Sequence, residues 1–157
     1  MSLPPSAKRV QHALEEKGYA HLRVVALPAS TRTAQEAAEA VGAHVGQIVK
    51  SLIFMGTRPY LFLVSGRNRL DLPKAQRAAG ETLRRATPEE VRLLTGYAIG
   101  GVPPAGHPTP LPTFCDEDLL AYPRVWAAGG TPNALFSLTP GELLALTGAR
   151  VADLKEA

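Results

Sequence analysis

A lysine stands in the middle of an otherwise apolar segment. Lys50 interrupts residues 45–54, which are rich in β-branched and apolar side chains and predict a strand buried on both faces. An ammonium group is costly to bury unless it is paired or faces a wet cleft. Two interpretations are therefore open: Lys50 packs its stem and extends its head to water, or it is a functional cation at a cleft.

A second candidate for chemistry is a glycine- and proline-rich connection, residues 96–110, which contains the adjacent Gly100 and Gly101. A loop of this length inside a compact domain is typically functional or disordered. Proline stiffens a backbone, and glycine lets it approach a ligand closely. The composition favours an ordered binding loop.

The common catalytic and cofactor motifs are absent from the sequence. It contains no G-x-x-x-x-G-K-[ST] phosphate loop, no G-x-G-x-x-G and no G-x-S-x-G. The histidines have no metal-ligand spacing among themselves or with Cys115, so we expect neither a metal nor a cofactor. Cys115, the single cysteine, is interpreted as a buried strand residue rather than a nucleophile.

Composition limits the possible classes of protein. A chain of 157 residues with 45% hydrophobic and 20% charged residues is typical of one globular domain, which we expect to span residues 1–157. The net charge of +3 permits a polyanionic partner without requiring one. No apolar run is long enough to span a membrane, and residues 1–5 lack a signal-peptide core. With one cysteine, a reducing compartment is expected, and we predict a cytoplasmic protein.

Local patterns predict the elements that position these residues. Capping boxes begin helices at Thr33, Thr87 and Thr139. A short turn at residues 56–59 predicts an antiparallel hairpin that contains the Lys50 strand. The expected helices cover residues 6–18, 34–42, 72–80, 89–95 and 142–147, and the expected strands cover 22–27, 45–54, 60–65, 83–86, 111–115, 124–128 and 134–138. The fold class is α/β, one domain with a mixed sheet.

Several short segments occur together in a distinctive order. They are residues 33–38, 46–52, 64–66, 71–74, 95–97, 100–106, 111–112 and 129–130. In this order and spacing the sequence resembles the YbaK/prolyl-tRNA editing-domain family, free-standing relatives of the editing insert in bacterial prolyl-tRNA synthetases. The resemblance implies a single compact α/β domain with a curved, mixed, mainly antiparallel central sheet flanked by helices.

The resemblance also implies an activity and a site. The activity is metal-free hydrolysis of a mischarged aminoacyl-tRNA, expected to be tRNA-Pro carrying Cys, Ala, Ser or Thr. Lys50 matches the family's main functional residue, and the segment of Gly100 and Gly101 matches the one whose backbone N–H groups face the ester. These groups and a positioned water or ribose hydroxyl could together promote hydrolysis without a nucleophile–base pair.

The remaining candidate residues fall into two groups. The expected substrate-binding residues are Thr33, Ser51, Tyr97, Gly129, Gly130 and Asn133. The expected tRNA-binding residues are Arg32, Arg67, Arg69 and Lys74. Each has a simpler interpretation: Thr33 as a helix cap, Tyr97 as loop packing, and the basic residues as solvated surface. Ser51 alternates to the face of the strand opposite Lys50.

The choice of amino acid stays open at this stage. Residues 129–133 read Gly-Gly-Thr-Pro-Asn, which differs from the Gly-Gly-Lys-Arg-Gly turn of the cysteinyl-specific members. The alternative function is a non-catalytic module that binds aminoacyl-tRNA or a synthetase through the same cleft. A general RNA-binding domain is less favoured because aromatic residues are few. Prolyl-tRNA synthetase is a potential partner, whereas no membrane or DNA partner is expected.

Overall fold

An antiparallel hairpin forms the middle of the structure. In the computed structural model, which describes residues 3–157, β2 (Val49–Met55) pairs with β3 (Pro59–Ser65) along its full length. The predicted hairpin is therefore confirmed. The strand begins later than residue 45, because Val45–Gln47 forms a 3₁₀ turn, η1, in which the ring of His44 accepts a hydrogen bond from the Gly46 N–H.

The strands divide between two sheets. The larger has the order β4-β2-β3-β5-β8 and is mixed, since β4 (Arg84–Arg85) is antiparallel to β2 while β5 (Thr113–Asp116) and β8 (Arg150–Ala152) run parallel to their neighbours. The smaller is antiparallel, β1 (Val25–Ala26), β7 (Ala134–Leu138) and β6 (Val125–Ala128). The expected α/β class is confirmed, but the strands are shared between two sheets rather than collected in one.

The helices begin and end where their capping residues stand. They are α1 (Pro5–Glu16), α2 (Ala34–Val41), α3 (Leu72–Ala79), α4 (Pro88–Thr95) and α5 (Pro140–Thr147), with a 3₁₀ helix η2 (Glu117–Ala121). All three predicted capping boxes form. In α2, Thr33 Oγ1 accepts from the Glu36 N–H at 3.1 Å and the helix ends at Gly42 in the left-handed region.

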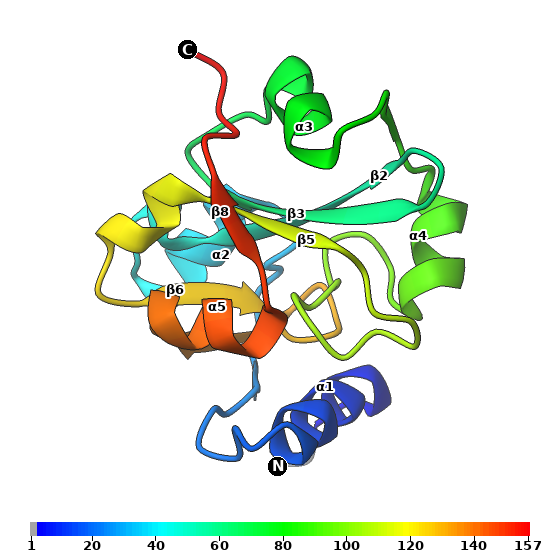
Figure 1. The fold of residues 1–157 in the computed structure, drawn as a ribbon. Coiled ribbons are helices and arrows are strands. Elements are labelled where there is room, and N and C mark those ends of the chain that lie inside the picture. Colours follow the sequence, from blue (N-terminus) through cyan, green and yellow to red (C-terminus); the bar gives the residue numbers. More distant parts are fainter. Residues whose placement is uncertain (1–2) are drawn as a thin grey trace.

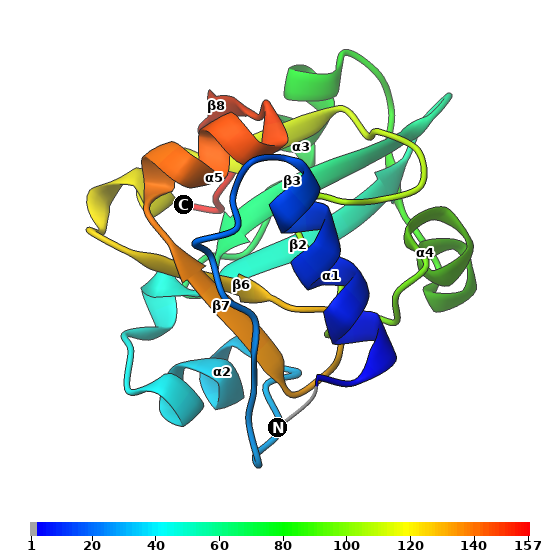
Figure 2. The ribbon, with the colours of Figure 1, turned by 90° about the horizontal axis from the view of Figure 1, so that it is seen from below.

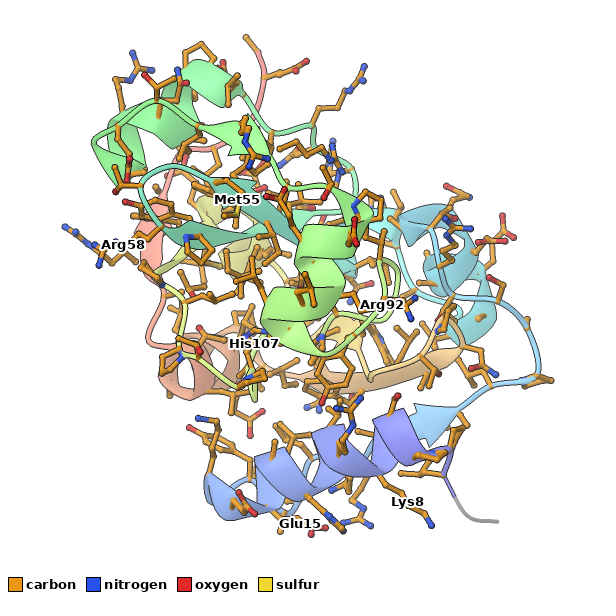
Figure 3. All side chains as sticks on the ribbon, turned by 90° about the vertical axis from the view of Figure 1, so that its right-hand side faces the viewer. Lys8, Glu15, Met55, Arg58, Arg92 and His107 are labelled. Atoms are coloured by element: carbon orange, nitrogen blue, oxygen red, sulfur yellow. The ribbon has the colours of Figure 1, made fainter. Side chains whose placement is uncertain are left out.

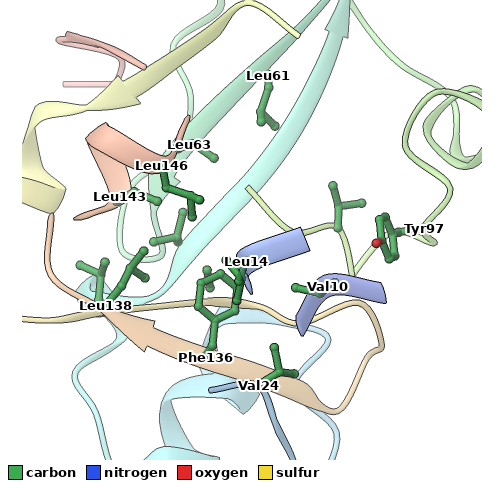
Figure 4. Packing of buried hydrophobic residues seen from close by; sticks show 14 of the residues in the cluster. Val10, Leu14, Val24, Leu61, Leu63, Tyr97, Phe136, Leu138, Leu143 and Leu146 are labelled. Carbon is green, nitrogen blue, oxygen red and sulfur yellow. The ribbon is translucent and has the colours of Figure 1, made fainter. Parts of the chain in front are cut away.

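Two hydrophobic cores lie on opposite faces of the hairpin, whose place in the fold is seen in Figures 1 and 2. Side chains alternate along β2, so Val49 and Ile53 join the larger core and Leu52 and Phe54 the smaller. The smaller core lies under α3, and the larger lies between the hairpin, the three-stranded sheet, α5 and α1 (Figure 4). By the same alternation, Lys50 belongs to the face of β2 that is turned toward α3, and Ser51 belongs to the opposite face.

Some elements differ from the sequence prediction. The first strand is limited to Val25–Ala26, because only these two residues pair with β7. The tail contains the short strand β8, which was not predicted; two of its three residues are exposed, so no apolar pattern marks it. Residues 96–110 contain no helix or strand, and they pack around the buried Val102, Pro103 and Pro104.

Candidate active site

A cavity of about 300 Å³ lies along the open edge of β2. On the side away from β3, β4 pairs only with Phe54 and Met55, and a single parallel bridge joins Ile48, just before β2, to Trp126 of β6, so residues 50–52 have no strand partner there. Consecutive residues of the strand, from both of its faces, therefore reach the cavity. The polar side chains that line it are Thr31, Arg32, Thr33, Lys50, Ser51 and Arg85; its apolar wall includes Ala34, Ala37, Ile48, Val102 and Leu135. The volume is in the usual range for a small-molecule site, about 300–1,000 Å³.

Lys50 is half-buried at this cavity. Its Nζ donates to the backbone carbonyl of Asn68. Burial lowers the pKa of Lys50, and the charges of Arg69 and Arg85 act in the same direction, while the carboxylate of Asp116 opposes them. The ammonium is thus held in a place that disfavours its charge, which is the situation of many functional groups.

Two carboxylates hold the loop that contacts Lys50. Asp116, fully buried at the end of β5, accepts from the Ser65 N–H at 3.0 Å and from Asn68 Nδ2 at 2.8 Å. Asp118 accepts from the same amide nitrogen at 2.9 Å and from Lys155 Nζ at 2.9 Å. These bonds fix the Asn68 carbonyl against Lys50. No pattern in the sequence indicates this network, because its members come from four distant segments.

Gly100 and Gly101 have different positions. The Gly101 N–H donates to the Ala98 carbonyl at 2.9 Å and closes a turn, in which Gly100 has φ +93°. Gly101 N–H is therefore occupied, and the expectation that it faces the ester is wrong. Gly100 lines the cavity, and within residues 3–157 its N–H has no hydrogen-bond partner.

The turn at residues 129–133 is hydrogen-bonded to two other segments, at Leu27 and at Gly101. Asn133 Nδ2 donates to the Leu27 carbonyl at 3.0 Å, and its Oδ1 accepts from Thr131 Oγ1 at 2.7 Å. The Gly130 N–H donates to the Gly101 carbonyl at 2.9 Å. Gly129, Gly130 and Asn133 are not among the residues that line the cavity, so their expected contacts with substrate stay a prediction.

Tyr97 is also away from the cavity. Tyr97 as a whole residue is 4% exposed and belongs to the larger core, and the guanidinium carbon of Arg9 from α1 lies 4.7 Å from the centroid of its ring. Burial raises the pKa of its hydroxyl. Stacking on a base needs an accessible ring face, so the expectation for Tyr97 is wrong and its alternative, loop packing, is observed.

Of the predicted substrate residues, Thr33 and Ser51 line the cavity. Thr33 Oγ1 is already engaged as the cap of α2. Ser51 lies there although it is on the opposite face from Lys50, because the open strand edge exposes both.

The basic residues are dispersed. Arg32 lines the cavity and a neighbouring hollow that also includes Arg92 of α4, which Figure 3 labels. Arg67 lies at a separate hollow beside Asp118, and Lys74 forms an ion pair with Asp153 at 2.8 Å. Arg69 is exposed and close enough to influence Lys50. Sequence reasoning missed Arg85 and Arg92, because nothing local distinguishes them from other surface arginines.

The charge of the cavity is one-sided. Arg32, Lys50 and Arg85 line it, and no aspartate or glutamate of the described chain does. Such a cavity favours a ligand whose negative charge lies near the opening of the cavity.

Within residues 3–157 no group of three or more His, Cys, Asp or Glu side chains is placed to hold a metal. Nor does this part of the chain contain a helix of the length and apolarity needed to cross a membrane.

Comparison with known proteins identifies the family. Residues 28–146 match the model of the aminoacyl-tRNA editing domain. The chain belongs to this family. The predicted resemblance is thus confirmed, and so is the enzyme class, aminoacyl-tRNA deacylase, at the level of the editing-domain family.

Individual relatives agree with this assignment. A crystal structure of a candidate trans-editing enzyme for prolyl-tRNA synthetase superposes with a TM-score of 0.96 at 74% identity, covering 99% of this chain and 100% of that one. YwhH of Bacillus subtilis is 33% identical over 124 residues, 78% of this chain and 79% of YwhH. EbsC of Enterococcus faecalis, a candidate Cys-tRNA(Pro)/Cys-tRNA(Cys) deacylase, is 29% identical over 125 residues, 78% of this chain and 76% of EbsC.

A segment of proline–tRNA ligase is similar as well. The enzyme of Thermosipho melanesiensis is 37% identical over 79 residues, which are 49% of this chain and only 14% of the ligase. The similarity therefore concerns one part of a much longer enzyme.

Proposed function

We propose that this editing domain hydrolyses mischarged tRNA-Pro in trans, releasing a small amino acid of the set Cys, Ala, Ser and Thr. The observation that carries the proposal is the cavity lined by both the half-buried Lys50 and Gly100, whose N–H has no hydrogen-bond partner within residues 3–157. Support for tRNA-Pro comes from the relatives named for prolyl-tRNA editing and from the similar segment in proline–tRNA ligase. The same relatives make prolyl-tRNA synthetase a candidate partner.

The cavity suits the hydrolysis of an ester. Water, positioned by a neighbouring ribose hydroxyl, adds to the ester carbonyl; the bond from the carbonyl carbon to the ribose oxygen then breaks, the ribose oxygen takes a proton from the water, and the amino acid leaves with a free carboxyl group. Negative charge develops on the carbonyl oxygen, where the Gly100 N–H donates a hydrogen bond. The Lys50 ammonium lies in the same cavity and stabilises this charge or the terminal phosphate. Arg32 and Arg85 bind the phosphates that follow.

The test is deacylation of tRNA-Pro charged separately with Cys, Ala, Ser, Thr and Pro. We expect rapid release of at least one wrong amino acid, while prolyl-tRNA stays intact. No release from any of the five would contradict the proposal and favour a binding module that uses the same cavity.

The rate should fall at alkaline pH. In our proposal Lys50 acts as a cation, so activity is present below its pKa and is lost as the pH rises through it. Because burial, Arg69 and Arg85 lower the pKa of Lys50, this loss should begin below the usual lysine value of about 10.4. The measurement is kcat/KM against pH, after subtraction of uncatalysed hydrolysis. A rate that rises with pH over the same range would indicate a neutral amine acting as a base and contradict the cationic role.

A further inference from the structure

A second hollow adjoins the cavity on the side of α4. It has a volume of about 470 Å³, and its lining includes Arg32, Pro88, Glu89, Arg92, Ile99 and Pro132. Arg32 and Ile99 line the cavity as well. The hollows at Arg67 and at Lys74 share no lining residue with the cavity. A long ligand that leaves the cavity past Arg32 therefore enters the hollow beside α4.

Arg32 and the turn at residues 98–101 form the boundary between the cavity and this hollow. A Cβ at residue 100 would lie 2.7 Å from Arg32 Cγ, so the stem of Arg32 packs directly against the Gly100 backbone. Gly100 carries the donor proposed for the ester oxygen, and Ile99, which is 40% exposed, precedes it in the same turn. The hollow thus begins next to the proposed place of the ester.

Two arginines without an ion-pair partner line the hollow. Arg32 and Arg92 are exposed, and the ion pairs within residues 3–157 are made by other side chains. Arg92 lies on α4 (Figure 3), one turn after the start of the helix that forms one wall. A planar guanidinium matches the oxygens of a phosphate group. The two arginines therefore favour a ligand that carries phosphate.

The other lining residues suit a nucleotide base. Pro88, Ile99 and Pro132 provide apolar surface against which the flat face of a base can pack. Glu89, in the first turn of α4, is the carboxylate of the hollow. A carboxylate repels phosphate, but it accepts a hydrogen bond from the amino group of cytosine, whereas uracil presents a carbonyl oxygen at that position. Phosphate-binding and amine-binding groups together fit a cytidine phosphate.

We propose that this hollow binds the cytidine phosphate that precedes the terminal adenosine of a tRNA, with Arg92 on its phosphate and Glu89 on the amino group of its base. Every tRNA ends in cytidine, cytidine and adenosine, so a strand whose ester lies at Gly100 presents a cytidine next as it passes Arg32. Arg32 binds the phosphate that joins the two nucleotides. This inference rests on the proposed function and adds a second binding site to it.

The test measures binding with probes that cannot be hydrolysed. They are 3′-alanylamino-3′-deoxyadenosine, and the same compound extended to the dinucleotides pCpA and pUpA, each titrated by calorimetry. Wild type is expected to bind the pCpA probe at least about five-fold more tightly than the adenosine probe, which is the effect of one exposed charge pair. It should also prefer pCpA to pUpA.

Arg92→Met should remove most of the affinity that the cytidine phosphate adds and leave the affinity for the adenosine probe unchanged. Methionine keeps the apolar stem and removes the charge. The matched control is Arg77→Met, because Arg77 is also an exposed arginine in the last turn of an eight-residue helix and lines neither the cavity nor the hollow. This variant should bind all three probes as wild type does.

The outcomes separate this inference from the proposed function. A gain from the cytidine phosphate that Arg92→Met removes supports the inference, even if no charged tRNA is deacylated and the proposed function fails. Deacylation of tRNA-Pro without any gain in the pCpA probe would overturn the inference and leave the function standing. An undiminished gain in Arg92→Met would overturn it too. So would equal affinity of wild type for pCpA and pUpA, because Glu89 would then make no contact with the amino group of cytosine.

Discussion

Replacing Lys50 with alanine is expected to lower kcat/KM for deacylation by about 100-fold or more, the usual effect of removing a group that stabilises developing negative charge. Lys50→Met should have the same effect, because methionine keeps most of the apolar stem and removes only the charge. The fold disfavours the charge of Lys50, as its lowered pKa shows, so Lys50→Met should not lower the Tm. The measurement is single-turnover deacylation beside a thermal melt.

Lys8 offers a matched control for Lys50. It is an exposed lysine on α1, far from the cavity along the chain (Figure 3). Lys8→Ala removes the same charge from the molecule and should keep wild-type turnover, which separates a local effect from a change in net charge. Wild-type turnover in a well-folded Lys50→Met protein would refute the assignment of Lys50.

Local patterns were sufficient to predict the part of the site that one segment provides. The apolar run around Lys50 and the turn after it predict the hairpin, and three capping boxes predict three helix starts, because each signal is contained in a few neighbouring residues. Lys50 and Gly100 were selected for the same reason. The position of Ser51 at the cavity depended on an unpaired strand edge, which the sequence does not reveal.

Except for Gly101, whose N–H closes a local turn on Ala98, the expectations that the structure does not support concern contacts between distant residues. Asn133 has a residue type common in binding loops, but its amide is used by Leu27, 106 positions away. The sequence suggests that the Tyr97 ring is available for stacking, but in the structure Arg9 of α1 lies over this ring. Thr31, which lines the cavity, was missed because nothing in the neighbouring residues marks it as a cavity residue. Hydrogen-bond partners of this kind are decided by the fold as a whole.

Replacing Gly101 with alanine should damage the site without touching any group that lines the cavity. A Cβ at residue 101 would lie 2.9 Å from the Thr131 nitrogen and 3.0 Å from the Gly130 carbonyl carbon. These are backbone atoms, so the turn at residues 98–101 must move away from residues 130–131 and strain the bond between the Gly130 N–H and the Gly101 carbonyl. The overpacking should cost about 1–3 kcal/mol of folding free energy, which lowers the Tm by several degrees.

The same displacement moves Gly100, which carries the proposed donor to the ester oxygen. A shift of about 1 Å in a positioned group can reduce a rate about 100-fold, so we expect Gly101→Ala to lose most of its turnover at temperatures where it is still folded. Gly141→Ala is the matched control, because a Cβ there would approach only Thr139 Oγ1, at 3.9 Å, in the first turn of α5. Its Tm and kcat/KM should equal those of wild type. If Gly101→Ala lowered the Tm but kept full turnover, hydrolysis of the ester would not depend on the Gly100 N–H. Lys50 alone would then have to stabilise the negative charge that develops on the ester oxygen.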